Sequence, residues 1–219
     1  MLPDTTKDEI RISVAFTGYR PQKLPFGDNW DHPDAKKLRA VLYNEYDRLI
    51  RKGFRFFLTG GALGSDMMTA EVILELKKKY SKLPIYHELC LPCYGHSSKW
   101  ECRDIERLER IKKQSVVTYV TDGPYCSGCM QKRNEYMVDT SAVLVAVYDG
   151  QNGGTRNTVE YAKSRRKKTV IIRPRGFIRV ELFQKPEDVD QLMLAEFDDY
   201  DDGVEAVSTK RSGKSNLKI

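Results

Sequence analysis

Short apolar runs alternate with longer amphipathic stretches over most of the chain. Apolar runs of about four to eight residues predict strands, whereas apolar residues three and four apart predict helices. Strands are expected over residues 12–16, 54–58, 84–91, 115–120, 142–147 and 169–172, and helices over residues 35–51, 65–79, 100–113, 130–139 and 155–166. This alternation predicts an α/β fold: a doubly wound, mainly parallel sheet of about six strands with helices on both faces.

Glycines and small hydroxyl residues gather after the predicted strands, whereas the opposite connections are charged and chemically plain. Turns alone also favour glycine and proline, but they do not explain this one-sidedness. The carboxyl ends of parallel strands share one edge of the sheet, where open α/β sheets bind ligands. The candidate ligand-binding residues are Thr17, Gly18, Tyr19, Arg20, Gly60, Gly61, Ala62, Gly64, Ser65, Asp66, Pro92, Lys99, Trp100, Arg133, Asn134, Met137, Gly153, Gly154, Thr155 and Thr158.

Two of these connections resemble phosphate-binding loops, because glycines precede a predicted helix. Residues 60–66 read Gly-Gly-Ala-Leu-Gly-Ser-Asp, and residues 153–158 read Gly-Gly-Thr-Arg-Asn-Thr. Neither loop is a dinucleotide-binding fingerprint or a Walker loop. The simpler interpretation is that Ser65, Asp66 and Thr155 only cap their helices.

Five cysteines include two C-x-x-C pairs, Cys90 with Cys93 and Cys126 with Cys129, and Cys102 lies between them. Four thiolates could hold a structural zinc ion, which we keep as an alternative. Small buried cysteines are commonly inert, so we expect no metal site. A redox pair is disfavoured because neither pair opens a predicted helix as in thioredoxin-like proteins.

The composition, 40% hydrophobic and 31% charged over 219 residues, is typical of a globular chain. We expect a cytoplasmic protein, because no apolar stretch could span a membrane and residues 1–9 do not form a secretory signal. Residues 186–219 hold nine acidic and four basic residues, which leaves a net charge of +11 in residues 1–185. A basic surface attracts phosphates on a nucleotide or a nucleic acid, unless it is simply solvated.

The chain is expected to form one domain over residues 1–182. Residues 183–202 are predicted to be an acidic C-terminal extension, and apolar residues spaced between positions 189 and 197 allow a helix there. Residues 203–219 are polar and are predicted to be a disordered tail.

Five ordered motifs between residues 16 and 162 carry a resemblance to a known family. They are Phe16-Thr17-Gly18-Tyr19-Arg20-Pro21-Gln22-Lys23-Leu24-Pro25-Phe26-Gly27, Gly61-Ala62-Leu63-Gly64-Ser65-Asp66 with Ala70-Glu71, Leu91-Pro92-Cys93 with Lys99-Trp100, Arg133-Asn134 with Tyr136-Met137-Val138-Asp139, and Gly153-Gly154-Thr155 with Tyr161-Ala162. Over about residues 11–173 the chain resembles the YpsA-like branch of the SLOG superfamily. These Rossmann-like domains are related to the DNA-processing Smf/DprA proteins and to the LOG phosphoribohydrolases. The resemblance implies a nucleotide-derivative ligand in the rim cleft, and Tyr19 departs from the histidine usual in the branch.

The LOG enzymes cleave N-glycosidic bonds with an arginine and a glutamate from the motifs M-x-x-R-K and P-G-G-x-G-T-x-x-E. In this chain Met130 and Arg133 keep the spacing of the first motif, and Gly153, Gly154 and Glu160 keep that of the second. Several other motif positions differ. By this resemblance Arg133 and Glu160 are the candidate catalytic residues, with Arg133 holding a phosphate and Glu160 stabilising a ribose cation or activating water. Without the resemblance, Arg133 reads as a surface arginine and Glu160 as a carboxylate favoured by its helix dipole.

The expected function is that of a sensor or binding domain for a nucleotide derivative, such as an ADP-ribose or nucleotide-like ligand, with no required cofactor. The alternatives are a phosphoribohydrolase and a nucleic-acid-binding module related to Smf/DprA. The nucleic-acid module ranks last because the sequence holds no dedicated DNA-binding motif. The expected partner is therefore a small molecule and not a membrane, and a homo-oligomer is left open.

Overall fold

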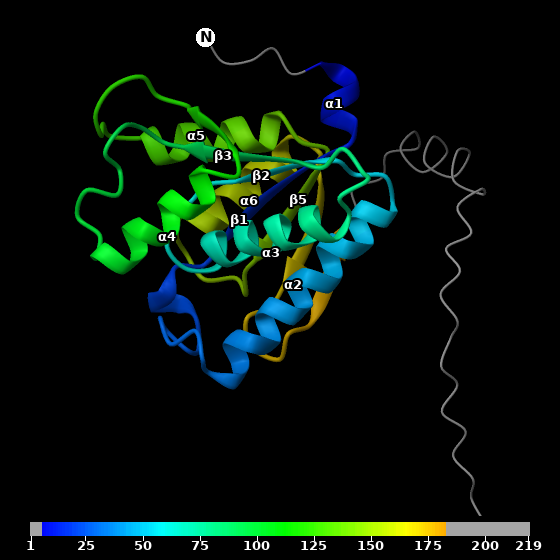
Figure 1. Cartoon of the computed structure of the whole chain (residues 1–219), viewed down its shortest axis with the longest axis horizontal. Helices are drawn as coiled ribbons and strands as arrows, with labels where there is room; N and C mark the ends of the chain where they lie inside the picture. The colour runs from blue at the N-terminus through cyan, green and yellow to red at the C-terminus, as the bar shows by residue number, and fades with distance from the viewer. Residues whose placement is uncertain (1–5, 183–219) are drawn as a thin grey trace, which may run out of the picture. The chain divides into compact units, whose positions relative to one another are not determined.

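A seven-stranded sheet forms the centre of the computed structural model, which describes residues 6–182 (Figure 1). The strands are β1 (Ser13–Gly18), β2 (Phe56–Thr59), β3 (Tyr86–Leu91), β4 (Val116–Tyr119), β5 (Val143–Val147), β6 (Lys168–Ile172) and β7 (Arg179–Leu182). Their order is β4-β3-β2-β1-β5-β6-β7, and every neighbouring pair is parallel except β6 with β7. The predicted doubly wound, mainly parallel α/β fold is confirmed. The predictions for residues 183–202 and 203–219 lie outside the described residues.

Helices cover both faces of the sheet, as predicted. They are α1 (Lys7–Arg11), the 3-10 turn η1 (Pro21–Lys23), α2 (Pro33–Arg51), α3 (Ser65–Lys79), α4 (Cys102–Lys112), α5 (Cys129–Asp139) and α6 (Gly154–Ser164). Figure 1 shows α2, α3 and α4 in front of the sheet and α5 and α6 behind it. This division follows from right-handed crossovers. From β1 to β4 the chain adds each strand toward one edge of the sheet, and with β5 and β6 it adds strands toward the other edge, so the connecting helices lie on opposite faces. The short α1 and η1 were not predicted, since a single turn shows no helical periodicity.

β7 is the strand that the sequence pattern missed. It returns from β6 through a tight turn, in which the N–H of Arg173 donates to the Ile178 carbonyl at 2.9 Å. β7 has only four residues, and charged side chains alternate with apolar ones, so it lacks the apolar signal of the parallel strands. The buried carboxylate of Glu45 in α2 forms an ion pair with Arg179 at 2.5 Å and holds this edge strand against the domain.

Apolar side chains from α3, α4 and β3 form a core cluster on the front face of the sheet. Its buried members are Met67, Ala70, Leu74, Leu89, Leu91, Leu108 and Ile111. On the other side of β1, all five residues of β5 are buried, which confirms a central strand covered on both faces. Burial of this kind is worth about 1.5–3 kcal/mol for each large apolar side chain, and it fixes the strand ends that carry the site.

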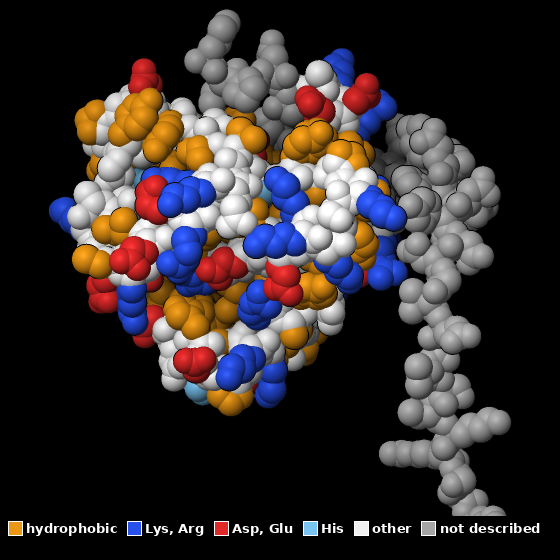
Figure 2. All heavy atoms as spheres, in the orientation of Figure 1, with side chains coloured by type: hydrophobic (Ala, Val, Ile, Leu, Met, Phe, Trp, Pro, Cys, Tyr) orange, Lys and Arg blue, Asp and Glu red, His pale blue; other side chains and the backbone are white. Residues whose placement is uncertain are grey.

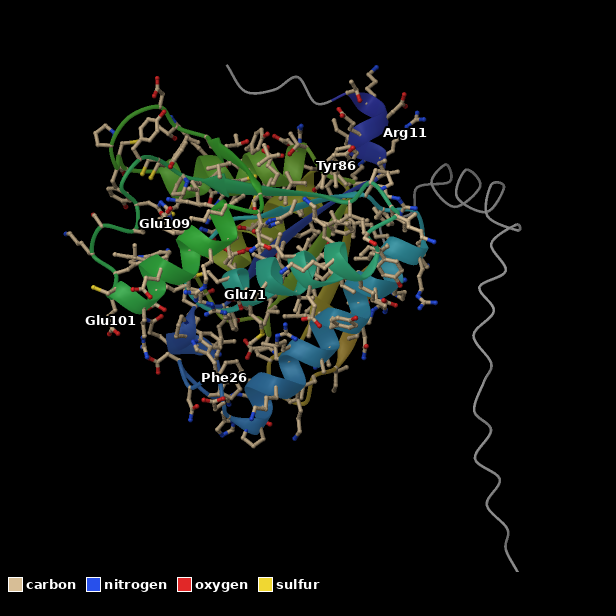
Figure 3. All side chains as sticks on the ribbon, viewed as in Figure 1. Arg11, Phe26, Glu71, Tyr86, Glu101 and Glu109 are labelled. Atoms are coloured by element: carbon tan, nitrogen blue, oxygen red, sulfur yellow. The ribbon has the colours of Figure 1, made fainter. Side chains whose placement is uncertain are left out.

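The face formed by α2, α3 and α4 carries basic and acidic side chains side by side (Figure 2). Arg107 donates two hydrogen bonds of 2.6 Å to Glu71, which lies on the side of α3 toward α4 (Figure 3). Lys79 pairs with Asp47 at 2.7 Å between α3 and α2. These basic side chains are therefore paired with carboxylates of a neighbouring helix. Within residues 6–182, no helix is both long and apolar enough to cross a membrane.

His87 is a buried, neutral histidine near the start of β3. Its Nε2 lies 2.9 Å from the hydroxyl of Thr59, and its Nδ1 lies 2.7 Å from the hydroxyl of Ser115. The Ser115 hydroxyl donates to the Ile111 carbonyl, so it accepts from Nδ1–H, and the Thr59 hydroxyl donates to Nε2. Burial lowers the pKa of His87 to about 3, because no partner compensates a charged ring there.

This burial makes the fold sensitive to mild acid. In the unfolded chain His87 titrates near its ordinary pKa of about 6.5, so below that pH the unfolded state binds more protons than the folded state. Between pH 7 and pH 5 we expect His87 to account for a loss of about 2 kcal/mol of stability. Urea unfolding at both pH values should show a smaller loss for His87→Gln than for wild type. Equal losses of stability in the two proteins would contradict the assignment to His87. The pKa of His96 is also lowered, so His96→Gln is measured in parallel to separate the contribution of that histidine.

Candidate ligand site

The predicted rim lies where the strand order reverses. β1 is flanked by β2 and β5, and the chain leaves β1 and β5 toward opposite faces of the sheet. Gly18 at the end of β1 is level with Val147 at the end of β5. Open α/β sheets bind ligands in the crevice at such a switch point. The loops after β1, β2, β3 and β5 all border this edge, as the sequence pattern predicts.

Tyr19 joins the loops on the two sides of the switch point. Its side chain is buried, and its hydroxyl donates to Asp149 Oδ1 at 2.6 Å and accepts from the Gln151 N–H at 3.1 Å. Burial, and then the Asp149 carboxylate, raise the pKa of Tyr19 to about 12, so the phenol stays protonated. Tyr19 therefore supports the rim from behind and has no spare hydroxyl proton for a ligand.

Arg133 lies beneath the rim instead of pointing into an open cleft. Its side chain is 5% exposed, and its Nη1 donates to the carbonyls of Gly60 and, at 3.3 Å, of Cys90. Its Nε donates to Asn134 Oδ1 at 2.8 Å, and Asp66 Oδ2 lies 4.0 Å from Nη1. Burial lowers the pKa of Arg133 and raises that of Asp66, while the attraction between the two charges opposes both shifts. The guanidinium thus ties together β2, β3 and α5.

The first glycine-rich loop is filled by a carboxylate of its own. Asp66 accepts hydrogen bonds from the N–H groups of Gly60 at 3.3 Å and Ala62 at 3.2 Å. Gly61 has a φ of +62°, and a Cβ there would lie 2.9 Å from Leu91 Cδ2. The glycine is therefore required by its backbone conformation and by core packing. These contacts give the loop a supporting role, and its predicted phosphate contact stays a prediction.

The second glycine-rich loop is open. α6 begins without a side-chain cap, Gly153 and Gly154 are exposed, and a Cβ on Gly154 would meet no atom within 4 Å. The ammonium of Lys23 donates to the Asn152 carbonyl and lies 5.4 Å from the ring centroid of Tyr19. An uncapped first turn presents N–H groups and the positive end of the helix dipole, and a neighbouring cation strengthens its attraction for anions.

Arg20 and His96 lie near Arg133 and could offer polar groups to a ligand. Arg20 is exposed and close enough to His96 and Arg133 to lower the pKa of both. Burial, followed by the nearby cations, lowers the pKa of His96 to about 4, so its ring is neutral at pH 7. Its Nε2 is buried without a hydrogen-bond partner in the described part of the chain, and its ring meets Trp100 edge-on at 5.3 Å. Such a nitrogen suits a ligand hydroxyl or the edge of a base.

The predicted ligand residues divide into a supporting set and an accessible set. The buried, supporting residues are Thr17, Tyr19, Gly60, Gly61, Gly64, Ser65, Asp66, Pro92, Arg133, Met137 and Thr158. The half-buried or exposed residues are Gly18, Arg20, Ala62, Lys99, Trp100, Asn134, Gly153, Gly154 and Thr155. The residues of the second set are the more accessible to a ligand.

Sequence reasoning missed Lys23, Asp149 and the burial of His96. Lys23 lies three residues after Arg20 in the first motif, and Asp149 lies two residues after the end of β5, so their positions after strands could have indicated both. His96 is half-buried in the loop after β3, where the sequence alone favours a solvated histidine over one that touches a ligand. Its burial depends on how the loop after β3 packs around Trp100, which no local pattern shows.

Glu160 lies on the solvent side of α6. Its side chain is 54% exposed and pairs with Lys163 at 3.4 Å, whereas Thr158 and Ala162 form the buried side of the helix. No hydrogen bond or ion pair joins Glu160 to Arg133 within residues 6–182. The structure therefore does not bring the two candidate catalytic residues together.

The cysteines are not gathered into a metal site. Cys90, Cys93 and Cys129 are buried, whereas Cys102 and Cys126 are exposed, and all five are free thiols. No group of three or more histidine, cysteine, aspartate or glutamate residues in the described chain is placed to hold a metal ion. The zinc alternative thus lacks a ligand set there. α5 begins at Cys129, so the second C-x-x-C pair does open a helix, in contrast to the prediction.

Comparison with known proteins agrees with this architecture. The YpsA model, described as the YspA SLOG family, matches residues 14–173. The uncharacterized SPbeta prophage-derived protein YoqJ of Bacillus subtilis strain 168 is 34% identical over 149 residues, 60% of this chain and 84% of that protein. A UPF0398 protein of Bacillus pumilus strain SAFR-032 is 31% identical over 144 residues, 65% of this chain and 76% of its own length.

Two solved structures share the fold. DNA processing protein A from Helicobacter pylori superposes with a TM-score of 0.51 at 16% identity, over 76% of this chain and 68% of that chain. The protein of that name from Streptococcus pneumoniae gives 0.50 at 13% identity, over 73% of this chain and 49% of that chain. At such identities these likenesses show the fold alone. The family match, by contrast, runs from β1 to the end of β6 and includes all five motifs. The chain belongs to the YspA SLOG family, the YpsA-like branch that its motifs indicate.

Proposed function

We propose that the protein binds a nucleotide derivative, such as an ADP-ribose or nucleotide-like ligand, with a phosphate at the first turn of α6. The observation that carries this proposal is the uncapped, exposed N-terminus of α6 at the switch point, with the ammonium of Lys23 beside it. The first glycine loop is the weaker candidate, because Asp66 already accepts from two of its amides, those of Gly60 and Ala62.

The remainder of the ligand would extend along the rim toward Arg20, His96 and Trp100. Residues 20–23 form one short segment with Arg20 near His96 and Lys23 near Gly153. An elongated ligand with a phosphate at one end and a base at the other fits this arrangement. The neutral His96 ring would supply a hydrogen bond, and the half-buried Trp100 an apolar surface.

Binding is better supported than cleavage. The guanidinium of Arg133 is committed to two carbonyls inside the protein, and the carboxylate of Glu160 faces solvent beside Lys163. A phosphoribohydrolase of the LOG type would need both groups at the ribose, within hydrogen-bond reach of the reacting atoms. The hydrolase alternative would therefore require a rearrangement of both residues.

Replacing Lys23 with alanine tests the binding proposal. Calorimetry with ADP-ribose and with AMP should show wild-type binding and roughly a 10-fold or larger loss of affinity in Lys23→Ala, as expected for losing a charge-assisted contact. Lys163→Ala is the matched control, because Lys163 is an exposed lysine of α6 itself but pairs with Glu160. No wild-type binding of any phosphate-bearing nucleotide, or equal affinity in Lys23→Ala, would refute the proposed site.

Glu160→Gln separates binding from hydrolysis. This substitution keeps the side-chain shape and removes a charge that lies at an exposed position. We expect less than a twofold change in affinity, and no measurable release of free base from AMP or ADP-ribose by either protein. Chromatography of the reaction mixtures follows the release. Rapid release by wild type that disappears in Glu160→Gln would establish the hydrolase instead.

Single-stranded nucleic acid is the second candidate ligand. The Helicobacter pylori protein of the same fold is described as binding single-stranded DNA, and residues 1–185 of this chain carry a net charge of +11. Phosphate contacts to a nucleic acid would weaken steeply with salt. Fluorescence anisotropy with a labelled oligonucleotide would support this candidate if binding were tight, salt-dependent and unaffected by ADP-ribose.

A further inference from the structure

Two buried thiols face each other beside the candidate site. The Sγ atoms of Cys93 and Cys129 are 3.9 Å apart, and both side chains are fully buried. A disulfide needs a separation of about 2.05 Å, so a side-chain adjustment of about 2 Å would join them. We propose that Cys93 and Cys129 are an oxidation site that forms a reversible disulfide. Figure 3 shows neighbouring sulfur atoms near the start of α5.

The two thiols belong to segments that Arg133 already holds together. Cys93 follows β3, which carries the Cys90 carbonyl that accepts from Arg133. Cys129 is the first residue of α5 and lies one turn before Arg133 on the same buried side of that helix. A bond between Cys93 and Cys129 would therefore reinforce an existing contact and would need little movement of the backbone.

Cys126 gives an oxidant access to this buried pair. It is exposed in the turn before α5, and the N–H of Cys129 donates to its carbonyl at 3.2 Å. It is also close enough to Cys93 to contribute to the raised pKa of that thiol. The exposed Cys126 thus lies in the turn that leads to the buried Cys129, which faces the buried Cys93.

The chemistry balances with a hydroperoxide as oxidant. Cys126 releases its proton and the thiolate attacks hydrogen peroxide; the O–O bond breaks, the departing hydroxide takes up that proton, and a sulfenic acid and one water form. Cys129 then attacks the Cys126 sulfur, the S–O bond breaks, and the second water leaves. Cys93 finally attacks the Cys129 sulfur, and the Cys126 thiolate leaves and takes up the proton that Cys93 lost. In total, two thiols lose two electrons and two protons, and one peroxide becomes two waters.

Burial determines where the oxidation ends. Burial, and then the neighbouring thiols, raise the pKa of Cys93 to about 11, so Cys93 is protonated at neutral pH and reacts last. The product bond between Cys93 and Cys129 lies inside the protein, whereas a bond that includes Cys126 stays open to external thiols. The inner disulfide is therefore the more slowly reduced of the two.

Disulfide mapping of the full-length protein tests the proposal without any nucleotide. After treatment with hydrogen peroxide, digestion under non-reducing conditions and mass spectrometry should reveal a peptide pair joined through Cys93 and Cys129. We expect Tm to rise by roughly 5 °C, reversibly with dithiothreitol, because the bond constrains the unfolded chain. Cys126→Ser should slow formation of the bond by roughly 10-fold or more, since it removes the exposed nucleophile.

Cys102→Ser is the matched control, because it removes the other exposed thiol and should change neither the pairing nor its rate. Products limited to a bond between Cys126 and Cys129, to adducts on Cys126 or Cys102, or to dimers between chains would overturn the proposal. So would unchanged kinetics in Cys126→Ser. Mapping in wild type decides the pairing even if Cys93→Ser or Cys129→Ser fails to fold.

Discussion

Replacing Arg133 with alanine is expected to lower the free energy of unfolding by about 3–5 kcal/mol, because it leaves a buried charge without its partner. Arg133 is the cation nearest to the buried Asp66 carboxylate, at 4.0 Å, and it satisfies the carbonyls of Gly60 and Cys90. Without Arg133, the two carbonyls would lose this donor, and the Asp66 carboxylate would keep its two backbone N–H donors but lose its buried countercharge. Arg133→Lys should be intermediate, since an ammonium keeps the charge but loses the fork of donors.

Urea unfolding at pH 7 measures this effect. Lys132→Ala is the control, because Lys132 is the exposed neighbour in α5 and should change stability by less than about 0.5 kcal/mol. A double-mutant cycle with Asp66→Asn should show coupling between the two buried groups. An Arg133→Ala protein within about 1 kcal/mol of wild type would mean that the pair is not the structural centre of the rim. Loss of ligand binding in Arg133→Ala therefore counts as a site effect only where the fold is intact.

The parallel sheet could be predicted because its first six strands are apolar and each of the first five is followed by an amphipathic helix. Residues 142–147 show this most clearly, since β5 is buried along its whole length. β7 could not be predicted in this way, because it is an edge strand whose arginine and glutamate are held by ion pairs with α2. Its place in the sheet depends on Glu45, which is more than 130 residues away in sequence.

The position of the rim could be predicted from the order of strands and glycines, but the degree to which its side chains are buried could not. Helical spacing indicates that Arg133 shares a face with Met137, and the structure shows that this face is turned into the protein. Likewise, the residues of the 60–66 loop give no sign that Asp66 folds back on the amides of Gly60 and Ala62. Both features arise from contacts between distant segments, so local pattern cannot show them.

The two glycine loops should respond in opposite ways to valine. Gly61→Val is expected to destabilise the fold by at least about 2 kcal/mol, because a side chain at φ +62° is strained and overpacks the core near Leu91. Gly154→Val should leave stability within about 1 kcal/mol of wild type, since a Cβ at this helix start meets nothing within 4 Å.

Ligand affinity, in contrast to stability, should fall strongly in Gly154→Val. In Gly154→Val the isopropyl group would crowd the first-turn amides of α6, and we expect roughly a 100-fold loss of affinity for a phosphate-bearing nucleotide. Gly154→Ala, with one methyl group, should lose less and so provides a graded control. Circular dichroism and urea unfolding first establish that each variant is folded, and calorimetry with ADP-ribose then gives the affinities. Wild-type affinity in a folded Gly154→Val protein would place the phosphate elsewhere, because no anion could rest on those amides while a branched side chain stands over them.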